Sequence, residues 1–325
     1  MFTKETIHNK NVLLRADLDV TLKDGRVAND YRLQALLPTI KLCLEHATKT
    51  VIVGHLGRPE GADPAFSLTP VKDSLKSLLN QDIPLLTSGI PPGERWMGKS
   101  PLVMMENLRF NPREEKSDRK FTQNLATGAD VYVYEAFATY GPCASLSLIP
   151  EILPTHTGFR FDEEVTTLLK VLQNPLHPTL LLASGAKMDK LETIRQITPK
   201  FDKVLMGGLF AKPEARTEDG LDLSEQTTSL FVNEINKAKT IVLNGPLGRY
   251  EDGIHDKATK AVFQAILASN AFSVIGGGDT LAAIPALGFS YASFGFVSTG
   301  GGAMLEFLAT GTHPLLDTLK NAKLS

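Results

Sequence analysis

Residues 273–280 read Ser-Val-Ile-Gly-Gly-Gly-Asp-Thr, an apolar run that leads directly into glycine. Such a run favours a buried strand, and glycine lets the backbone turn tightly where the strand ends. The pattern recurs through the second half of the chain, where we expect strands at residues 179–183, 203–206, 240–243, 273–275 and 293–297. The glycine-containing turns that follow these strands are residues 184–187, 207–208, 244–246, 276–280 and 298–302.

These turns predict a shared anion site. Stretches of helix length separate the strands, which favours a parallel sheet whose carboxyl ends meet at one edge. A helix that starts at this edge offers unpaired N–H groups and a partial positive charge to an anion. One glycine turn more often only closes a loop, but a series along one edge favours a common crevice for a polyphosphate. Neither the Walker phosphate loop nor the dinucleotide fingerprint occurs in this half.

Charged residues beside two of the turns could serve such a ligand. Lys187 and Lys190 follow the turn at 184–185, and their spacing places both ammonium groups on one side of a helix start. Lysine is unfavourable at a helix N-terminus unless an anion binds there. Asp279 could hold Mg²⁺ and Thr280 a phosphate, although both are also ordinary helix-capping residues.

The first half of the chain predicts a second α/β unit with a mostly parallel sheet. We expect strands at residues 11–14, 50–53, 102–105 and 131–134, and helices after Asn29-Asp30 and at 68–79 and 114–125. Proline and small polar residues at 150–158 indicate a domain boundary. A helical pattern at 162–172 then leads into the second half.

Several arginines in this first half follow expected strands. Arg58 and Arg109 each come shortly after a strand end, and Arg15 and Arg32 add further guanidinium groups. The planar guanidinium suits carboxylates and phosphates, so these loops could form an anion site, although surface salt bridges would explain them as well. His55 has no metal-binding or nucleophilic partner nearby in the sequence, and we assign it to binding.

The bulk composition excludes several classes of function. The chain has 325 residues and a net charge of −2, so no overall charge draws it to nucleic acid or to an anionic membrane. No secretory signal or membrane span is evident, which predicts a cytoplasmic protein, and we expect a monomer. The two cysteines, Cys43 and Cys143, show no metal-binding pattern and are not expected to form a disulfide.

Taken together, motifs along nearly the whole chain resemble those of phosphoglycerate kinases in order and spacing. The motifs are VLLRADLDV (12–20), NDYR (29–32), HLGRP (55–59), ENLRF (106–110), GAK (185–187), NGPLG (244–248), GGGDT (276–280) and STGGGA (298–303). The resemblance implies two Rossmann-like domains joined by a hinge helix. Residues 1–157 with the tail 312–325 would bind the glycerate, and residues 158–311 would form a reduced nucleotide-binding domain.

The resemblance further implies reversible phosphoryl transfer between 1,3-bisphosphoglycerate with ADP and 3-phosphoglycerate with ATP, a step of glycolysis that uses Mg²⁺. The implied glycerate ligands are Asp17, Asp19, Arg32, His55, Arg58 and Arg109. The implied nucleotide ligands are Gly185, Lys190, Gly208, Gly220, Leu221, Asn244, Pro246, Glu251, Gly277, Gly278, Asp279 and Thr280, with Asp279 on the metal. Catalysis would be electrostatic, through Arg32 and Lys187, after closure about a hinge near residues 153–172.

The chain also departs from the family pattern. The loop at 135–144 reads EAFATYGPCA and lacks the histidine and arginine usual there, which predicts weaker glycerate binding. Asp19 stands where the family has asparagine and should repel an anionic substrate. Ser184 replaces a usual glycine, and the lysine turn is one residue shorter. Several dozen residues are missing between Leu209 and Asp219, which should remove part of the adenine wall.

Three functions therefore remain open on the sequence. An active, reduced phosphoglycerate kinase is favoured because Arg32, Lys187 and the GGGDT turn are all present. A non-catalytic homologue that binds a nucleotide or phosphometabolite is the second. A kinase for another small carboxylate is the third, because the altered loop at 135–144 could shape a different pocket.

Overall fold

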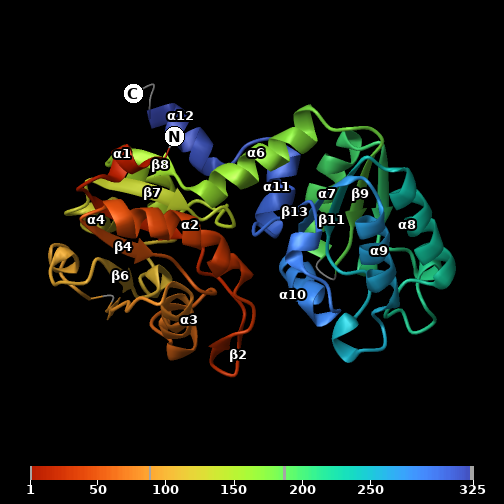
Figure 1. Cartoon of the computed structure of the whole chain (residues 1–325), viewed down its shortest axis with the longest axis horizontal. Helices are drawn as coiled ribbons and strands as arrows, with labels where there is room; N and C mark the ends of the chain where they lie inside the picture. The colour runs from red at the N-terminus through yellow and green to blue at the C-terminus, as the bar shows by residue number, and fades with distance from the viewer. Residues whose placement is uncertain (1, 88, 186–187, 323–325) are drawn as a thin grey trace. The chain divides into compact units, whose positions relative to one another are not determined.

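The computed structural model describes residues 2–87, 89–185 and 188–322 and divides the chain into two compact units. Unit 1 comprises Met1–Glu163 together with Thr312–Ser325, and unit 2 comprises Glu164–Gly311. The division falls within helix α6 (Phe159–Gln173), and the last helix, α12 (Pro314–Ala322), belongs to unit 1 (Figure 1). The expected α/β class with two sheets of parallel strands is confirmed.

Unit 1 contains a six-stranded parallel sheet in the order β5-β6-β4-β1-β7-β8. Its strands are β1 (Asn11–Ala16), β4 (Lys49–Val53), β5 (Leu85–Leu86), β6 (Leu102–Met105), β7 (Val131–Glu135) and β8 (Thr155–Thr157). A short antiparallel hairpin, β2 (Leu22–Lys23) and β3 (Arg26–Val27), follows β1. Because β1 lies between β4 and β7, the connections that leave β1 and β7 run in opposite directions, which makes the border of β1 and β7 a topological switch point, where such sheets bind ligands.

The sheet of unit 1 buries side chains on both faces, as parallel sheets do. Val12 and Leu14 of β1 join a core with Leu36 and Ile40 of α2 and Leu75 of α3. Residues that alternate with them point to the opposite face. The helices of this unit are α1 (Lys4–Ile7), α2 (Tyr31–His46), α3 (Thr69–Leu79), α4 (Arg119–Ala126) and α5 (Ala144–Ser147), with 3-10 turns at Pro64–Phe66, Glu94–Trp96, Leu108–Phe110 and Ile149–Glu151.

Unit 2 contains a five-stranded parallel sheet in the order β10-β9-β11-β12-β13. Its strands are β9 (Thr179–Ala183), β10 (Lys203–Met206), β11 (Thr240–Asn244), β12 (Phe272–Gly276) and β13 (Phe296–Val297). Its further helices are α7 (Leu191–Ile197), α8 (Glu225–Lys237), α9 (Lys257–Ala268), α10 (Gly278–Ala286) and α11 (Gly302–Thr310). Helix α8 packs beside α9, and α7 packs beside α11 (Figure 1). Short 3-10 turns lie at Met188–Lys190, Thr198–Lys200, Gly208–Phe210, Pro213–Ala215, Tyr250–Asp252 and Tyr291–Ser293.

Two sequence expectations about these elements were wrong in detail, and strand β8 was not expected. The helix expected at 114–125 begins only at Arg119, because the Asp118 side chain caps it by accepting from the Phe121 N–H. The strand expected at 293–297 is reduced to Phe296–Val297. The proline-containing stretch at 150–158 contains β8, whose pairing with β7 makes it an edge strand of the unit 1 sheet.

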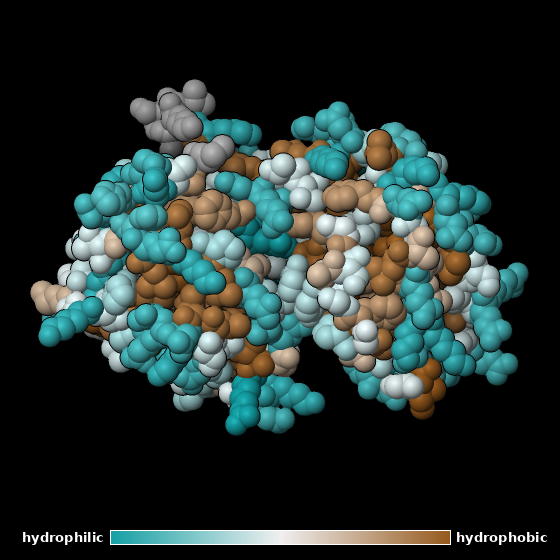
Figure 2. Space-filling view, viewed as in Figure 1, coloured by the Kyte–Doolittle hydropathy of each residue, from teal (hydrophilic) through white to brown (hydrophobic). Residues whose placement is uncertain are grey.

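Three further features concern the hydropathy of the surface, the apolar character of the helices and the state of the cysteines. On the face shown in Figure 2, hydrophilic residues cover much of each unit, and apolar residues form smaller groups among these hydrophilic residues. In the described part of the chain, no helix is long and apolar enough to cross a membrane. Cys43 and Cys143 are both buried and free, as expected.

Candidate functional site

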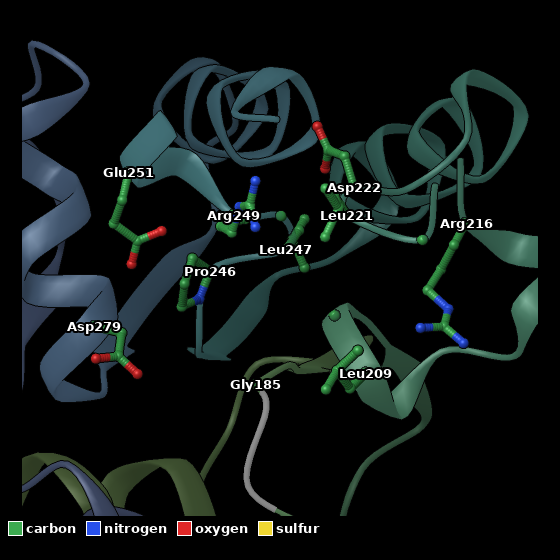
Figure 3. A pocket seen from close by; sticks show the side chains of 13 residues that line it. Gly185, Leu209, Arg216, Leu221, Asp222, Pro246, Leu247, Arg249, Glu251 and Asp279 are labelled. Carbon is green, nitrogen blue, oxygen red and sulfur yellow. The ribbon is translucent and has the colours of Figure 1, made fainter. Parts of the chain in front are cut away.

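A cavity of about 260 Å³ lies at the carboxyl edge of the unit 2 sheet. Strand β9 lies between β10 and β11, so the connections that leave β9 and β11 run in opposite directions. Ligands of open α/β sheets bind at such a switch point. The cavity is lined by Gly185, Gly208, Leu209, Arg216, Gly220, Leu221, Asp222, Pro246, Leu247, Gly248, Arg249, Glu251 and Asp279 (Figure 3).

Glycine is required where two of the turns meet. Gly245 has a φ of +98°, and a Cβ there would lie 1.9 Å from the carbonyl oxygen of Ser184. The turn after β11 therefore packs directly on the turn after β9, which no other residue would permit. The Ser184 hydroxyl donates to the carbonyl oxygen of Pro246 and joins the same two turns. The serine that departs from the family pattern thus has a structural role here.

Two of the predicted nucleotide ligands are buried behind the cavity wall. The Thr280 hydroxyl is inaccessible to solvent and accepts the N–H of Gly245 at 2.8 Å. The Asn244 amide is also buried and donates to the carbonyl oxygen of Gly301 at 3.3 Å. Both side chains connect neighbouring turns, so their contribution to a ligand would come through the position of the backbone.

Asp279 and Glu251 place two exposed carboxylates at one end of the cavity (Figure 3). Asp279 lies in the first turn of α10, behind Gly277, which caps the helix with a φ of +105°. The described residues hold no group of three or more side chains that could bind a metal by themselves. An exposed carboxylate at a helix N-terminus instead fits Mg²⁺ that is held mainly by nucleotide phosphates, as this ion prefers.

The predicted lysine pair is only partly described. Lys190 ends the 3-10 turn Met188–Lys190 and is the N-cap residue of α7. Lys187, together with the preceding alanine, lies outside the described residues. The structure therefore leaves the proposed pairing of the two ammonium groups as a sequence-based prediction.

Sequence reasoning missed several residues of the cavity, above all Arg216, Leu247 and Arg249. Arg216 lies at the end of the cavity opposite Glu251, and its Nε is buried without a hydrogen-bond partner in the described part of the chain (Figure 3). Arg249 directly follows the NGPLG motif, so proximity to a motif was the available signal. Arg216 follows no motif, so the sequence offered no signal that it lines the cavity.

In unit 1, the predicted glycerate ligands gather at the carboxyl ends of β1, β4 and β6. Asp17 and Asp19 follow β1, His55 follows β4, and Arg109 lies in the 3-10 turn after β6. Arg109 donates from Nη1 to the carbonyl oxygen of Gly57 at 2.7 Å. The exposed Arg58 lies beside that glycine in the sequence. Of these groups, Asp17 and Asp19 follow β1, which borders the switch point, and His55 and Arg109 lie on the loops after the next two strands of the sheet, β4 and β6.

Asp17 is an unusual carboxylate because it is almost fully buried, with 3% of its surface exposed. Neither oxygen accepts a hydrogen bond of normal geometry from the described residues, although Nη1 of Arg32 lies 3.4 Å from Oδ1. Burial raises the pKa of Asp17, and the Arg32 charge opposes this rise. The backbone N–H of Ala138 also lowers this pKa, but less than burial raises it, and a hydroxyl of a ligand could donate a further hydrogen bond to the buried carboxylate.

His55 is held by a buried arginine. Nη2 of Arg15 lies 2.6 Å from Nδ1 of His55, and Nε of Arg15 donates to the Ser145 hydroxyl at 3.1 Å. Burial lowers the pKa of His55 well below its usual value, and nearby arginines lower it further. Because arginine only donates, Nδ1 accepts, and the ring proton is on Nε2. Arg15 therefore fixes the tautomer of His55.

The altered loop at 135–144 contacts the C-terminal segment of the chain. The Tyr140 hydroxyl donates to the carbonyl oxygen of Thr312 at 2.9 Å, and its ring packs edge-on against His313. Arg160, a nearby arginine in the first turn of α6, donates from Nη1 to Glu163 at 2.8 Å. Tyr140 thus helps to dock the C-terminal segment on unit 1. The sequence predicted that the loop at 135–144 is altered, but it did not predict the contact of Tyr140 with Thr312.

Comparison with known proteins gives one family. The family model described as phosphoglycerate kinase matches residues 3–214 and 212–311. The phosphoglycerate kinase of Streptomyces avermitilis is 34% identical over 394 aligned positions, which cover 98% of each chain. That of Thermus thermophilus is 32% identical and covers 96% of this chain and 97% of its own.

Solved structures agree with these matches. The phosphoglycerate kinase from Pyrococcus horikoshii has a TM-score of 0.87 at 27% identity and covers both chains completely. The one from Coxiella burnetii has a TM-score of 0.79 at 28% identity over 98% of each chain. The alignment of 394 positions exceeds the 325 residues of this chain, so the relative contains residues missing here. The two family segments meet at 212–214, within the stretch where the sequence predicts this loss.

Proposed function

The chain belongs to the phosphoglycerate kinase family, and on this premise we propose that it catalyses reversible phosphoryl transfer between 1,3-bisphosphoglycerate with ADP and 3-phosphoglycerate with ATP. The acceptor is a carboxyl group, and the reaction belongs to glycolysis. The match to the family extends along nearly the whole chain.

The observation that carries the proposal is the position and lining of the unit 2 cavity. It lies at the topological switch point, and turns from the GAK, NGPLG and GGGDT motifs contribute Gly185, Pro246 and Asp279 to it. Apolar Leu209, Leu221 and Leu247 offer a surface for a base, while the turns and the α10 N-terminus suit phosphates. A nucleoside di- or triphosphate is the ligand that needs both.

Within this cavity we assign the phosphates to the turns and to the N-terminus of α10. Asp279, and with it the neighbouring Glu251, would hold Mg²⁺ carried by the nucleotide, which neutralises phosphate charge in the reaction. Without a cation, these carboxylates would repel the phosphates, so nucleotide binding should depend on Mg²⁺. Arg216 would contact the base or ribose, because its buried Nε is left without a partner in the described chain.

In unit 1 we assign the glycerate to the loops that follow β1, β4 and β6. Asp17 would accept a hydrogen bond from the substrate hydroxyl, and His55 would donate from Nε2. Arg32, Arg58 and Arg109 would bind the carboxylate and phosphate. The missing arginine has no counterpart in Tyr140 or Arg160, whose polar atoms contact other groups, so we expect a raised KM for 3-phosphoglycerate.

Catalysis is proposed to be electrostatic. Arg32 and Lys187 would stabilise the charge on the transferred phosphoryl group, which passes directly between the substrates. Closure of the two units about the α6 hinge stays a prediction. Small-angle scattering with and without both substrates tests it, because closure would reduce the radius of gyration.

The test of the function is a coupled assay with MgATP and 3-phosphoglycerate. We expect turnover in the wild type and a loss of kcat of at least about a hundredfold in Arg32→Ala and in Lys187→Ala. Arg26→Ala, in the exposed β2–β3 hairpin, is the matched control and should leave kcat unchanged. A folded wild type without turnover at saturating substrates would contradict the proposal, and nucleotide binding by calorimetry would then support a non-catalytic homologue. A screen of other small carboxylates as acceptors with ATP tests the third alternative, a kinase for a different carboxylate.

A further inference from the structure

His255 forms a bridge between two carboxylates from different loops. It lies between the 3-10 turn Tyr250–Asp252 and helix α9, and 15% of its side chain is exposed. Its Nδ1 lies 2.7 Å from Oδ2 of Asp252, and its Nε2 lies 2.7 Å from Oδ2 of Asp219. The two acceptors thus contact opposite sides of one imidazole ring.

This arrangement requires a charged ring. Ionised carboxylates only accept hydrogen bonds, so both ring nitrogens must carry a proton to satisfy both contacts. The neutral ring could donate to one carboxylate only and would place a lone pair against the other. The pKa of His255 is accordingly raised, with the hydrogen bond to Asp252 as the largest cause and the one to Asp219 as a further cause.

The bridge joins two walls of the cavity in unit 2. Asp219 belongs to loop 217–222, and residues 220–222 line the cavity. Asp252 belongs to loop 249–255, from which Arg249 and Glu251 line it. The two loops share one backbone hydrogen bond, from the N–H of Arg249 to the carbonyl oxygen of Leu221 at 2.9 Å. The contact of His255 with Asp219 connects the two loops a second time, through residues that do not line the cavity.

Each carboxylate is also hydrogen-bonded within its own loop, so the contacts of the ring connect the two loops and not only the two side chains. Asp219 accepts from the Thr217 hydroxyl at 2.6 Å and from the Leu221 N–H at 3.0 Å. Asp252 accepts from the N–H of Ile254 at 2.8 Å and from Nε of Arg249 at 2.9 Å. A movement of either carboxylate would therefore displace residues that line the cavity.

Loop 217–222 lies just after the point where the two family segments meet, so it has lost neighbouring chain that its relatives possess. We propose that protonated His255 is a positioning residue that holds loop 217–222 against loop 249–255 and thereby keeps the base end of the nucleotide cavity formed. The inference rests on the proposed function of that cavity. The inference goes beyond that function because it identifies a pH-dependent contact that stabilises the cavity of the shortened domain.

The pH dependence follows from the groups around the ring. Asp219 faces it from loop 217–222, Asp252 faces it from loop 249–255, and Arg249 contacts the same oxygen of Asp252 from the other side. Asp222, also on loop 217–222, feels the His255 charge more weakly. Since both carboxylates have lowered pKa values, the ring is the group whose loss of a proton breaks the bridge as the pH rises. The bridge is complete below the raised pKa of His255 and is lost as the pH rises through it.

The test compares wild type with His255→Gln and Asp219→Asn by steady-state kinetics from about pH 6 to pH 9. At low pH we expect KM for MgATP to rise about three- to tenfold in both variants, with kcat and KM for 3-phosphoglycerate within about twofold of wild type. The ratio of variant to wild-type KM should fall towards one as the pH rises, because wild type then loses the bridge as well. The ratio also cancels the titration of the nucleotide.

Two further variants sharpen this test. His177→Gln is the matched control, because His177 also contacts a carboxylate, that of Asp202 at 2.6 Å, but is 64% exposed and precedes β9, at the end of that strand opposite the cavity. It should leave every constant unchanged. His255→Arg keeps a permanent cation with several donors and should retain a low KM for MgATP at high pH. A variant-to-wild-type ratio that does not change with pH would overturn the proposal.

Hydrogen exchange separates this proposal from the proposed function. Amides of residues 217–222 should exchange faster in His255→Gln than in wild type at low pH, whether or not the protein has activity. Equal exchange in the two proteins would overturn the bridge even if the kinase is active. Absent turnover with faster exchange in the variant would support the bridge and contradict only the kinase assignment.

Discussion

Glu135 accepts a hydrogen bond from the hydroxyl of Thr39 at 2.5 Å, within the core of unit 1. The same carboxylate accepts the N–H groups of Arg160 and Phe161, each at 3.0 Å, in the first turn of α6. It thus caps the helix within which the two units divide. Burial raises the pKa of Glu135 from an ordinary 4.5 to about 7, in spite of these hydrogen bonds.

This pKa predicts how the stability of unit 1 changes with pH. Between about pH 4.5 and 7, the folded state keeps the Glu135 proton and the unfolded chain has lost it, so the contribution of Glu135 to stability falls as the pH rises through this window. Wild type should therefore lose on the order of 3 kcal/mol more between pH 5 and pH 8 than Glu135→Gln does.

Urea unfolding followed by tryptophan fluorescence measures this difference. The chain has a single tryptophan, Trp96, and it lies in unit 1, so the signal reports on that unit. Equal pH dependence in wild type and Glu135→Gln would show that Glu135 has an ordinary pKa. The measurement requires that unit 1 unfolds in one transition, which is checked by a second probe such as circular dichroism.

The contact between Arg15 and His55 predicts a single tautomer. Because the guanidinium donates to Nδ1, His55 should be neutral at pH 7 with its proton on Nε2. Nitrogen chemical shifts in a long-range ¹⁵N–¹H spectrum distinguish the two tautomers directly. Arg15→Met should mix the tautomers and raise KM for 3-phosphoglycerate more than it lowers kcat. A spectrum with the His55 proton on Nδ1 would contradict the assignment.

Asp19 predicts a variant that binds substrate better. Its Oδ1 accepts the N–H of Gly57 at 2.8 Å, which asparagine can still do, but the negative charge opposes an anionic glycerate. Because 42% of the side chain is exposed, the repulsion is worth about 1 kcal/mol at most. Asp19→Asn should lower KM for 3-phosphoglycerate about three- to fivefold, and less so at high salt. Asp24→Asn, in the exposed hairpin, is the control, and an unchanged KM in Asp19→Asn would refute the repulsion.

His313 predicts an acid-sensitive attachment of the C-terminal segment. Its ring packs among Tyr134, Phe137, Tyr140 and Phe161, and it bonds through both nitrogens to backbone groups, accepting from the Leu315 N–H at 3.1 Å. Protonation would abolish this acceptor, and burial lowers the pKa to about 4.

The stability that neutral His313 contributes is complete above its ordinary pKa of 6.5 and is lost as the pH falls towards 4. His313→Leu should therefore be less stable than wild type at pH 7 by about 1 to 2 kcal/mol and should lose less on acidification. Trp96 fluorescence again reports on unit 1. A steeper acid loss in the leucine variant than in wild type would contradict this account.

Most strands could be predicted because their local pattern and tertiary role agree. The apolar runs at 102–105 and 179–183 became buried strands with the expected limits, and the run at 203–206 became the edge strand β10, of which only Leu205 is buried. The edge strand β8 was missed because Thr155–Thr157 has little apolar character and is held by its pairing with β7. Local pattern does not encode such pairing.

The site divides in the same way. The glycine turns, Asp17, His55 and Asp279 could be recognised because each lies beside a strand end, and strand ends of a parallel sheet meet at one edge. The sequence by itself therefore determined the α/β class, the family and the residues at the two sheet edges. It could not determine that Thr280 and Asn244 face other turns, since this depends on where neighbouring loops lie.

Only the tertiary structure decided which partners distant residues find. Tyr140 meets Thr312, and His255 meets Asp219, across separations in sequence that carry no periodic signal. The physical reason is that hydrogen bonds and ion pairs act over a few ångströms, and the folded chain alone sets which groups come that close. Both of these contacts lie where the chain departs from its family, at the altered loop and beside the shortened segment.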